Sequence, residues 1–241
     1  MSVFDEKPLY DNRLLVGVGY KDTKPVFVNM AENPLMGICG SDEMGRIGYI
    51  RYLINEYAAN SDNSPVRLYI ADDPDAALRF SESLDITKEY SSSVSDIVDM
   101  LEKVHGIAES RYEKWKNDST ALDDEPLVIL LLNSKMSADV LVSTDETATQ
   151  FSSIVREYAK CRVCILIANA ENKMGSSYGS GQILSALRDS GNLLIFENIG
   201  DIKILNIPMA SVRAFKKANG AGDAFYLRGN DLIKLKTPLS E

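Results

Sequence analysis

The chain has 241 residues, of which 45% are hydrophobic and 25% are charged, as is usual for a soluble globular protein. Its 26 basic and 35 acidic residues give a formal net charge of −9, which argues against a partner such as nucleic acid, whose backbone needs a basic track. A chain of this length buries a substantial core as one large domain or two small ones. Because no internal repeat or low-complexity linker divides it, we expect a single domain over residues 1–241.

The start of the chain predicts no secretory signal, because residues 1–13 are polar and charged. The longest apolar runs, such as residues 127–132, are far shorter than the ~20 residues that a membrane span requires. We therefore expect this piece to be soluble and cytosolic, with any membrane anchor in sequence outside it.

The first predicted elements surround a glycine-containing loop. Residues 14–18 and 25–29 are expected to form two short strands, and the apolar run at 35–39 a third strand that enters the loop. A helix is expected over residues 46–59, where apolar side chains recur at steps of three and four. A further buried strand is expected at residues 66–70.

The loop itself has the spacing of a phosphate-binding P-loop but lacks its working side chains. It consists of Gly40, Ser41, Asp42, Glu43, Met44, Gly45, Arg46 and Ile47, with the glycines at the G-x-x-x-x-G spacing between a strand and a helix. Arg46 replaces the lysine that reaches the phosphates, and Ile47 replaces the hydroxyl that binds Mg²⁺. The loop either binds nucleotide weakly or keeps its shape without that function.

Two carboxylates, Asp42 and Glu43, lie within this loop, whose amide groups should surround an anion. If they point outward, they cost a bound phosphate little. If one of them folds inward, it could occupy the anion site itself.

The rest of the chain predicts alternating helices and strands. Ser93 and Asp96 are spaced as a capping box at the start of a long helix over residues 94–115. Further helices are expected at 138–141, 146–159 and 182–190, strands at 126–132, 161–168 and 193–196, and a loop at 169–180. Strands at 224–227 and 231–236 are expected to form a small edge hairpin. This alternation predicts an α/β fold with a mostly parallel sheet flanked by helices.

A second part of a nucleotide site is expected at Asn133, which follows the aliphatic strand at 126–132. P-loop enzymes hold magnesium with an acidic residue at such a strand end. Asn133 is neutral and cannot act as a base, although its carbonyl oxygen could still contact a metal. With Arg46, Ile47 and Asn133 all departing from the pattern, we predict no catalytic residue, no metal site and no meaningful ATP hydrolysis. No cofactor is expected, and any binding of ATP and Mg²⁺ would be weak.

Neither the cysteines nor the single histidine suggest another site. Cys161 and Cys164 are three residues apart in a predicted strand, so their side chains should point to opposite faces and cannot share a ligand. We interpret them, with Cys39, as buried reduced thiols. His105, on the long helix, is interpreted as structural because no nucleophile or metal pattern accompanies it.

The order of these features resembles the FtsK/SpoIIIE-type ATPase domain. The resemblance rests on Val16 to Gly19, the loop ending at Gly45, the helix end Glu109 to Tyr112 and the closing segment Gly220 to Gly222. The chain is similar in particular to the terminal, degenerate ATPase module of type VII secretion coupling proteins (EssC-type). It implies a RecA-like P-loop NTPase fold in which residues 40–47 and Asn133 are the former nucleotide and metal sites.

The resemblance also implies a place among several such modules in a cytoplasmic domain of a membrane-anchored protein. Secreted protein substrates and neighbouring ATPase modules are then the expected partners, with a homo-oligomer in the full protein and no nucleic acid. The favoured hypothesis is a non-hydrolysing module that recognises substrates or regulates the motor. Two alternatives stay open: a weakly active ATPase completed by a neighbouring subunit, and a DNA translocase domain, against which the acidic charge counts.

Overall fold

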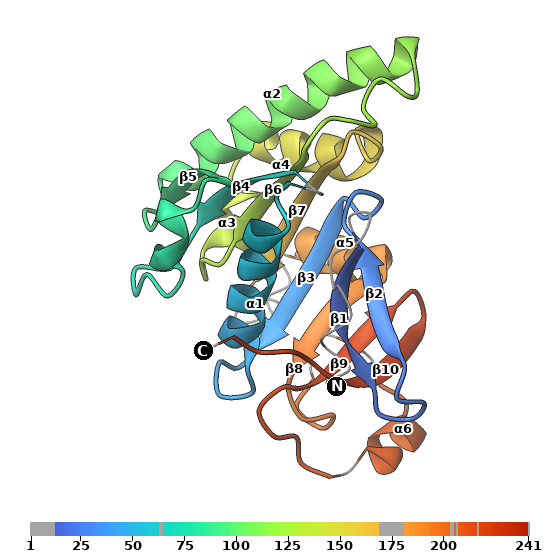
Figure 1. The fold of residues 1–241 in the computed structure, drawn as a ribbon. Helices are drawn as coiled ribbons and strands as arrows, with labels where there is room; N and C mark the ends of the chain where they lie inside the picture. Colours follow the sequence, from blue (N-terminus) through green and yellow to red (C-terminus); the bar gives the residue numbers. More distant parts are fainter. Residues whose placement is uncertain are drawn as a thin grey trace.

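The computed structural model describes residues 13–62, 65–168, 181–202, 205, 207–215 and 217–240, which form a ten-stranded sheet with helices on both faces (Figure 1). The strands are β1 (Arg13–Gly19), β2 (Pro25–Asn29), β3 (Leu35–Gly40), β4 (Val66–Ala71), β5 (Thr87–Ser91), β6 (Leu127–Leu132), β7 (Val163–Ala168), β8 (Asn192–Phe196), β9 (Asp223–Arg228) and β10 (Asp231–Lys236). The α-helices are α1 (Arg46–Ala59), α2 (Asp96–Asn117), α3 (Ser137–Val140), α4 (Asp145–Ser152), α5 (Gly181–Ser190) and α6 (Met209–Ala214). A 3₁₀ turn, η2 (Arg79–Ser83), and a π-helical turn, η3 (Ser153–Glu157), complete the elements.

The strand order is β2-β1-β10-β9-β8-β3-β7-β6-β4-β5. The part from β8 to β5 is parallel throughout, whereas β9, β10, β1 and β2 pair antiparallel. The prediction of an α/β fold with a mostly parallel sheet is therefore confirmed. The parallel part carries the glycine loop, which follows β3.

The aliphatic sequence of β6 shows why the sheet is covered on both sides. Ile129 and Leu131 pack in a core cluster with α1, while Val128, Leu130 and Leu132 pack in a second cluster with α2, α4 and α5. Alternate residues of a strand point to opposite faces, so a strand with two covered faces has no place for polar side chains. Figure 1 shows α1 in front of the sheet and α5 behind it.

Most predicted elements form close to their expected bounds, and α1 begins and ends where the periodicity predicts. Three elements differ. The β9–β10 hairpin is not at the edge of the sheet, because β1 pairs with β10 and leaves β2 as the outer strand. The single helix expected over residues 146–159 is divided into the α-helix α4 and the π-helical turn η3. Strand β7 begins at Val163 and not at residue 161. The predicted loop at residues 169–180 lies outside the described residues.

The predicted capping box at the start of α2 does not form. The residue before the helix is Ser95, whose side chain caps no backbone amide. The Asp96 carboxylate instead accepts hydrogen bonds from the hydroxyls of Ser91 (2.7 Å) and Ser95 (3.0 Å), and the Ser91 bond is the main cause of its lowered pKa. Ser93 and Asp96 have the spacing of a capping box, but the Asp96 carboxylate is bound to the neighbouring serine hydroxyls and not to a backbone amide at the start of the helix.

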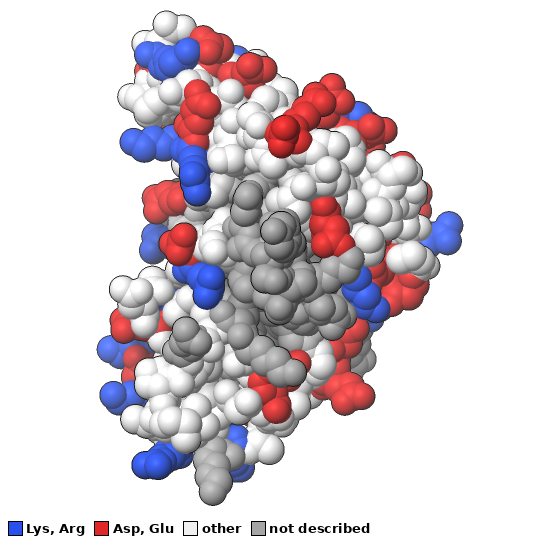
Figure 2. All heavy atoms as spheres, turned by 180° about the vertical axis from the view of Figure 1, so that it is seen from behind, with Lys and Arg blue, Asp and Glu red and all other residues white. Residues whose placement is uncertain are grey.

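Among the described residues, no helix has the length and apolar character needed to cross a membrane. On the face seen in Figure 2, lysine and arginine side chains are scattered among acidic ones.

Candidate functional site

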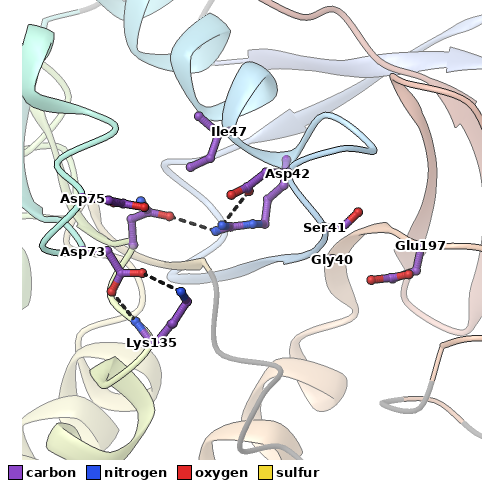
Figure 3. A pocket seen from close by; sticks show the side chains of 10 residues that line it. Gly40, Ser41, Asp42, Ile47, Asp73, Asp75, Lys135 and Glu197 are labelled. Atoms are coloured by element: carbon purple, nitrogen blue, oxygen red, sulfur yellow. Dashed lines mark hydrogen bonds and ion pairs between the residues drawn. The ribbon is translucent and has the colours of Figure 1, made fainter.

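The candidate site is a pocket at the carboxyl ends of the parallel strands, with a volume of about 250 Å³ (Figure 3). The residues that line it are Gly40, Ser41, Asp42, Arg46, Ile47, Asp73, Asp75, Asn133, Lys135 and Glu197. Loops from several strands converge at this edge of an open α/β sheet, which is where ligands usually bind. The structure thus brings Asn133 to the predicted loop, whereas Glu43, Met44 and Gly45 lie outside the lining.

The glycine loop is closed by hydrogen bonds within the protein. Four of its amides donate to carbonyl oxygens: Ser41 to Phe196 (3.1 Å), Met44 to Ser41 (3.2 Å), Gly45 to Asp42 (2.9 Å) and Arg46 to Ser41 (3.4 Å). In a phosphate-binding loop, amides of this kind point at the anion. These four amides already have acceptors within the protein, so they cannot bind a phosphate unless the loop rearranges.

The closing segment and the last described residues hold the loop from outside. The Gly222 amide donates to the Met44 carbonyl (2.8 Å), and the Ser240 amide donates to a carbonyl in the first turn of α1 (3.0 Å). At Gly45, where φ is 107°, an added Cβ would lie 2.9 Å from a methyl carbon of Leu239. Glycine at this position therefore serves both the left-handed backbone and the close packing of Leu239.

Arg46, which stands in place of the P-loop lysine, is buried, and both of its Nη groups have partners, whereas its Nε–H has no acceptor. Its side chain pairs with the Asp42 carboxylate at 2.7 Å and donates to the Asn133 side-chain carbonyl at 2.9 Å. Only 3% of its surface is exposed. The sequence left open whether the loop carboxylates point outward or inward. Asp42 stays largely exposed and pairs with Arg46, and does not occupy the anion site of the loop amides. The charge of Arg46 is therefore balanced by a carboxylate of its own loop.

Asn133 extends this polar network to a residue that sequence reasoning did not identify. Its side-chain amide donates to Asp72 at 2.7 Å, so both ends of the Asn133 side chain are used. The Asp72 carboxylate also accepts from the Leu78 amide (2.7 Å), the Asp73 amide (2.9 Å) and the Tyr90 hydroxyl (3.0 Å). The carbonyl oxygen of Asn133 that could have contacted a metal is bound to Arg46 instead.

Carboxylates outnumber cations around the pocket. The lining contains Asp42, Asp73, Asp75 and Glu197 against Arg46 and Lys135. Figure 3 shows Lys135 turned toward Asp73: its amide donates to that carboxylate at 2.9 Å and its ammonium lies 3.8 Å away. Burial, and secondarily the charge of Asp201, raises the pKa of Glu197. The phosphates of a nucleoside triphosphate would lie close to an excess of carboxylates here, and this electrostatic interaction is unfavourable at short range.

The described residues contain no cluster of side chains that could hold a metal ion. Within the described residues, no group of three or more His, Cys, Asp and Glu side chains is arranged to hold one. Ile47 lines the pocket with an aliphatic side chain where the P-loop pattern supplies a hydroxyl.

None of the three cysteines lines the pocket, and neither does His105. Cys161 packs in the cluster with α2 and Cys164 in the cluster with α1, on opposite faces as predicted. Burial raises the pKa of Cys161 to about 11, which keeps its thiol protonated. The His105 ring lies 5.6 Å from that of Tyr158 and is partly buried, consistent with a structural role.

The helix end that carries part of the family resemblance is also structural. Arg111 is buried and donates to the carbonyls of Cys161 (3.2 Å), Arg162 (3.0 Å) and Pro126 (2.8 Å), at the opposite ends of β6 and β7 from the pocket. Glu125 lies 3.4 Å from this guanidinium. Arg111 thereby ties α2 to the sheet.

A second hollow is apolar and lies beside α6. Its volume is about 560 Å³, and its lining is Ile199, Gly200, Ile202, Leu205, Ile207, Pro208, Met209 and Val212. Met209 is 65% exposed, and none of the α6 residues is buried. The sequence analysis predicted no element here, since α6 is short and carries no regular apolar stripe.

The strand order and the loop together define the class of fold. The central parallel strand β3 leads through the glycine loop into α1. The polar residue Asn133 follows β6, which is separated from β3 in the sheet by β7. This is the fold of RecA-like P-loop ATPase domains. No protein-family model matches the sequence, and no curated protein matches it either.

Solved structures show the particular version of this fold. ATPases 2 and 3 of EssC from Geobacillus thermodenitrificans align with a TM-score of 0.75 and 15% identity, over 100% of this chain and 44% of theirs. EccC from Thermomonospora curvata (ATPases 2 and 3), in complex with a signal sequence peptide, aligns with a TM-score of 0.68 and 14% identity, over 95% of this chain and 41% of that one. The pCW3 conjugation coupling protein TcpA, with ATPγS, gives a TM-score of 0.66 and 11% identity over 98% and 69%. The predicted resemblance is confirmed for the fold, and this chain spans less than half of the EssC and EccC chains.

The pocket residues that sequence analysis missed are Asp73, Asp75, Lys135 and Glu197, and it also missed Asp72, which holds Asn133. A usable signal was present, because Asp72 and Asp73 directly follow the apolar strand β4, at the sheet edge where sites form. Nothing in the sequence identified Glu197, since the order of β8 and β3 in the sheet is what brings it to the loop.

Proposed function

We propose that this chain is a module of a type VII protein secretion motor that does not hydrolyse ATP and that recognises secreted proteins or regulates the motor. The shared fold with EssC and EccC ATPases 2 and 3 supports this context. Its partners would be secreted protein substrates and neighbouring ATPase modules. The module would lie in the cytoplasm as part of a membrane-anchored protein, in line with the similarity to a structure described as the cytoplasmic domain of EssC.

The observation that carries the first half of the proposal is the pairing of the buried Arg46 with Asp42 and Asn133. Phosphoryl transfer depends on positioning the phosphates and neutralising their charge. A guanidinium whose two Nη groups are bound to Asn133 and Asp42 can do neither without releasing one of these partners. Because Arg46 is buried while the Asp42 side chain is 58% exposed, separating the pair costs less than separating a fully buried ion pair, but a bound nucleotide would still have to supply that cost.

The apolar hollow beside α6 supports a role in substrate recognition. Apolar side chains left uncovered in a hollow of this size are typical of surfaces that bind a partner. EccC carries a signal sequence peptide in its structure. We propose that an apolar segment of a secreted protein binds this hollow.

The test of the nucleotide half is calorimetry with Mg-ATP together with a phosphate-release assay on the whole chain. We expect no saturable, magnesium-dependent heat and no phosphate release above that of a protein-free sample. Steady release of phosphate by the purified chain would overturn the proposal.

Two variants separate missing side chains from a closed loop. Arg46→Lys with Ile47→Thr restores the P-loop cation and hydroxyl but leaves the loop amides bound to carbonyls. We expect it not to bind ATP, and tight binding would show that the side chains alone were responsible. Adding Asn133→Asp would set a second carboxylate against Asp72, which now accepts from Asn133 at 2.7 Å. Two carboxylates at that distance repel, so the triple variant should be less stable than the double variant.

A second candidate is a weakly active ATPase that powers translocation and is completed by a neighbouring subunit. The retained geometry favours it, since β3 still ends at Gly40 and α1 begins at Arg46. Phosphate release per chain would then rise steeply with protein concentration, whereas the proposed function predicts none at any concentration. A DNA translocase domain is disfavoured by the net charge of −9.

A further inference from the structure

A third hollow, separate from the two described above, lies between α1 and the turn that precedes η2. Its volume is about 350 Å³, and its lining is Arg51, Asn55, Ala76, Ala77 and Phe80. Both walls come from the described part of the chain.

Arg51 is the chemically distinctive residue of this hollow. Its one hydrogen bond runs from Nη2 to the Ala77 carbonyl at 3.2 Å, and its Nε–H has no acceptor. No described carboxylate lies within ion-pair distance of it, although the chain carries an excess of acidic residues. The Nε–H is buried, so the Nη groups are the donors that a ligand can reach, and Nη1 makes no hydrogen bond to a described residue. A guanidinium with a free Nη group and no described counter-ion is a suitable partner for an anion.

The remaining lining distinguishes between anions. Phe80 is 39% exposed and contributes an apolar ring to the same hollow as Arg51. Asn55, one turn along α1, donates to the Ser240 hydroxyl at 3.1 Å and keeps its side-chain carbonyl and second amide hydrogen for other partners. A phosphate dianion would be repelled more strongly than a carboxylate by a chain of net charge −9 and gains nothing from an aromatic neighbour.

We propose that this hollow, the Arg51 groove, binds an acidic side chain of a protein partner together with the apolar residue next to it. The carboxylate pairs with the Arg51 fork, the apolar side chain packs on Phe80, and the peptide backbone reaches Asn55. Because the groove involves neither the glycine loop nor the apolar hollow beside α6, this proposal is independent of the proposed function.

The test is an NMR titration of the 15N-labelled chain with the blocked dipeptide acetyl-Leu-Glu-amide. Saturable shifts should be confined to the Arg51 side chain and the amides around residues 51, 55 and 76–80. The dipeptide with glutamine in place of glutamate should bind about tenfold more weakly, the loss expected for one charge-assisted pair. Equal binding of the two dipeptides would overturn the proposal.

Variants and a simpler anion complete the test. Arg51→Gln should weaken binding of the glutamate dipeptide about tenfold, whereas Arg156→Gln, which removes an exposed arginine from η3, should leave it unchanged. Phe80→Ala should weaken the dipeptide but not sodium acetate. If acetate bound as tightly as the dipeptide, or if Arg51→Gln had no effect in a chain whose other resonances are unmoved, the assignment would be wrong.

Discussion

The glycine-loop pocket and the apolar hollow beside α6 differ in whether the side chains that line them have partners within the chain. In the pocket, the cations lie beside carboxylates of the same chain, Arg46 with Asp42 and Lys135 with Asp73. In the hollow, apolar side chains such as Met209 remain uncovered. The cations of the pocket are therefore already paired within the chain, whereas the apolar side chains of the hollow would gain free energy by binding an apolar partner.

The largest effect should come from breaking the buried network under the pocket with Asp72→Ala. This change removes the acceptor of four hydrogen bonds and leaves Asn133, Tyr90 and two amides without it. We expect a loss of about 3–5 kcal/mol in the free energy of unfolding, measured by urea denaturation.

The matched control is Asp75→Ala, which removes an exposed carboxylate from the lining of the same pocket. No described hydrogen bond or ion pair depends on it, so the change in stability should stay within about 0.5 kcal/mol. Equal effects of the two substitutions would mean that the pocket is an ordinary surface and that the network does not hold the fold.

A change in the hollow should give the reverse result: little effect on stability and a large effect on binding. Met209→Asp places a charge where an apolar segment would pack, yet Met209 is mostly exposed and supports no core contact that the fold requires. We expect urea denaturation to change by less than about 0.5 kcal/mol. Binding of a fluorescein-labelled signal-sequence peptide, followed by anisotropy, should weaken at least about tenfold, because the substitution desolvates a charge against the peptide.

Met209→Leu is the control, since it keeps an apolar side chain of similar size and should bind the peptide like the unaltered chain. Undiminished binding by Met209→Asp would place the peptide elsewhere on the molecule.

The contrast also explains which parts of the molecule the sequence could predict. The bounds of α1 and the buried strands followed from apolar periodicity, because one or two covered faces leave a repeating pattern. β5 (Thr87–Ser91) could not be predicted in this way, because it is a polar outer strand next to β4 and shows no such pattern. The place of the β9–β10 hairpin could not be predicted either, since nothing in its own sequence identifies β1 as its neighbour.

The site was predictable residue by residue only where a local motif exists. The glycine loop and Asn133 were found from spacing and from the end of an aliphatic strand, and the structure places them at one pocket. The sequence does not determine that Asp42 pairs with Arg46, because the direction of the Asp42 side chain depends on the backbone conformation of the loop. Asp72 and Glu197 needed the strand order, which is a property of the whole sheet.

The smallest effect should come from Glu197→Gln, which tests whether the pocket is crowded with negative charge. Burial and the neighbouring Asp201 raise the pKa of Glu197 above its ordinary value of 4.5, so ionisation of this group works against the folded state. Its favourable contribution is complete below the unfolded-state pKa and is lost as the pH rises through the folded-state value. The neutral glutamine should therefore stabilise the chain at pH 7.5, by less than about 0.5 kcal/mol because solvent screens a partly exposed group. Urea denaturation at pH 7.5 and at pH 4 should show the gain at the higher pH and its disappearance at the lower. A loss of stability at pH 7.5 would instead reveal a favourable partner for the carboxylate and a pocket that attracts negative charge, as a working phosphate site would.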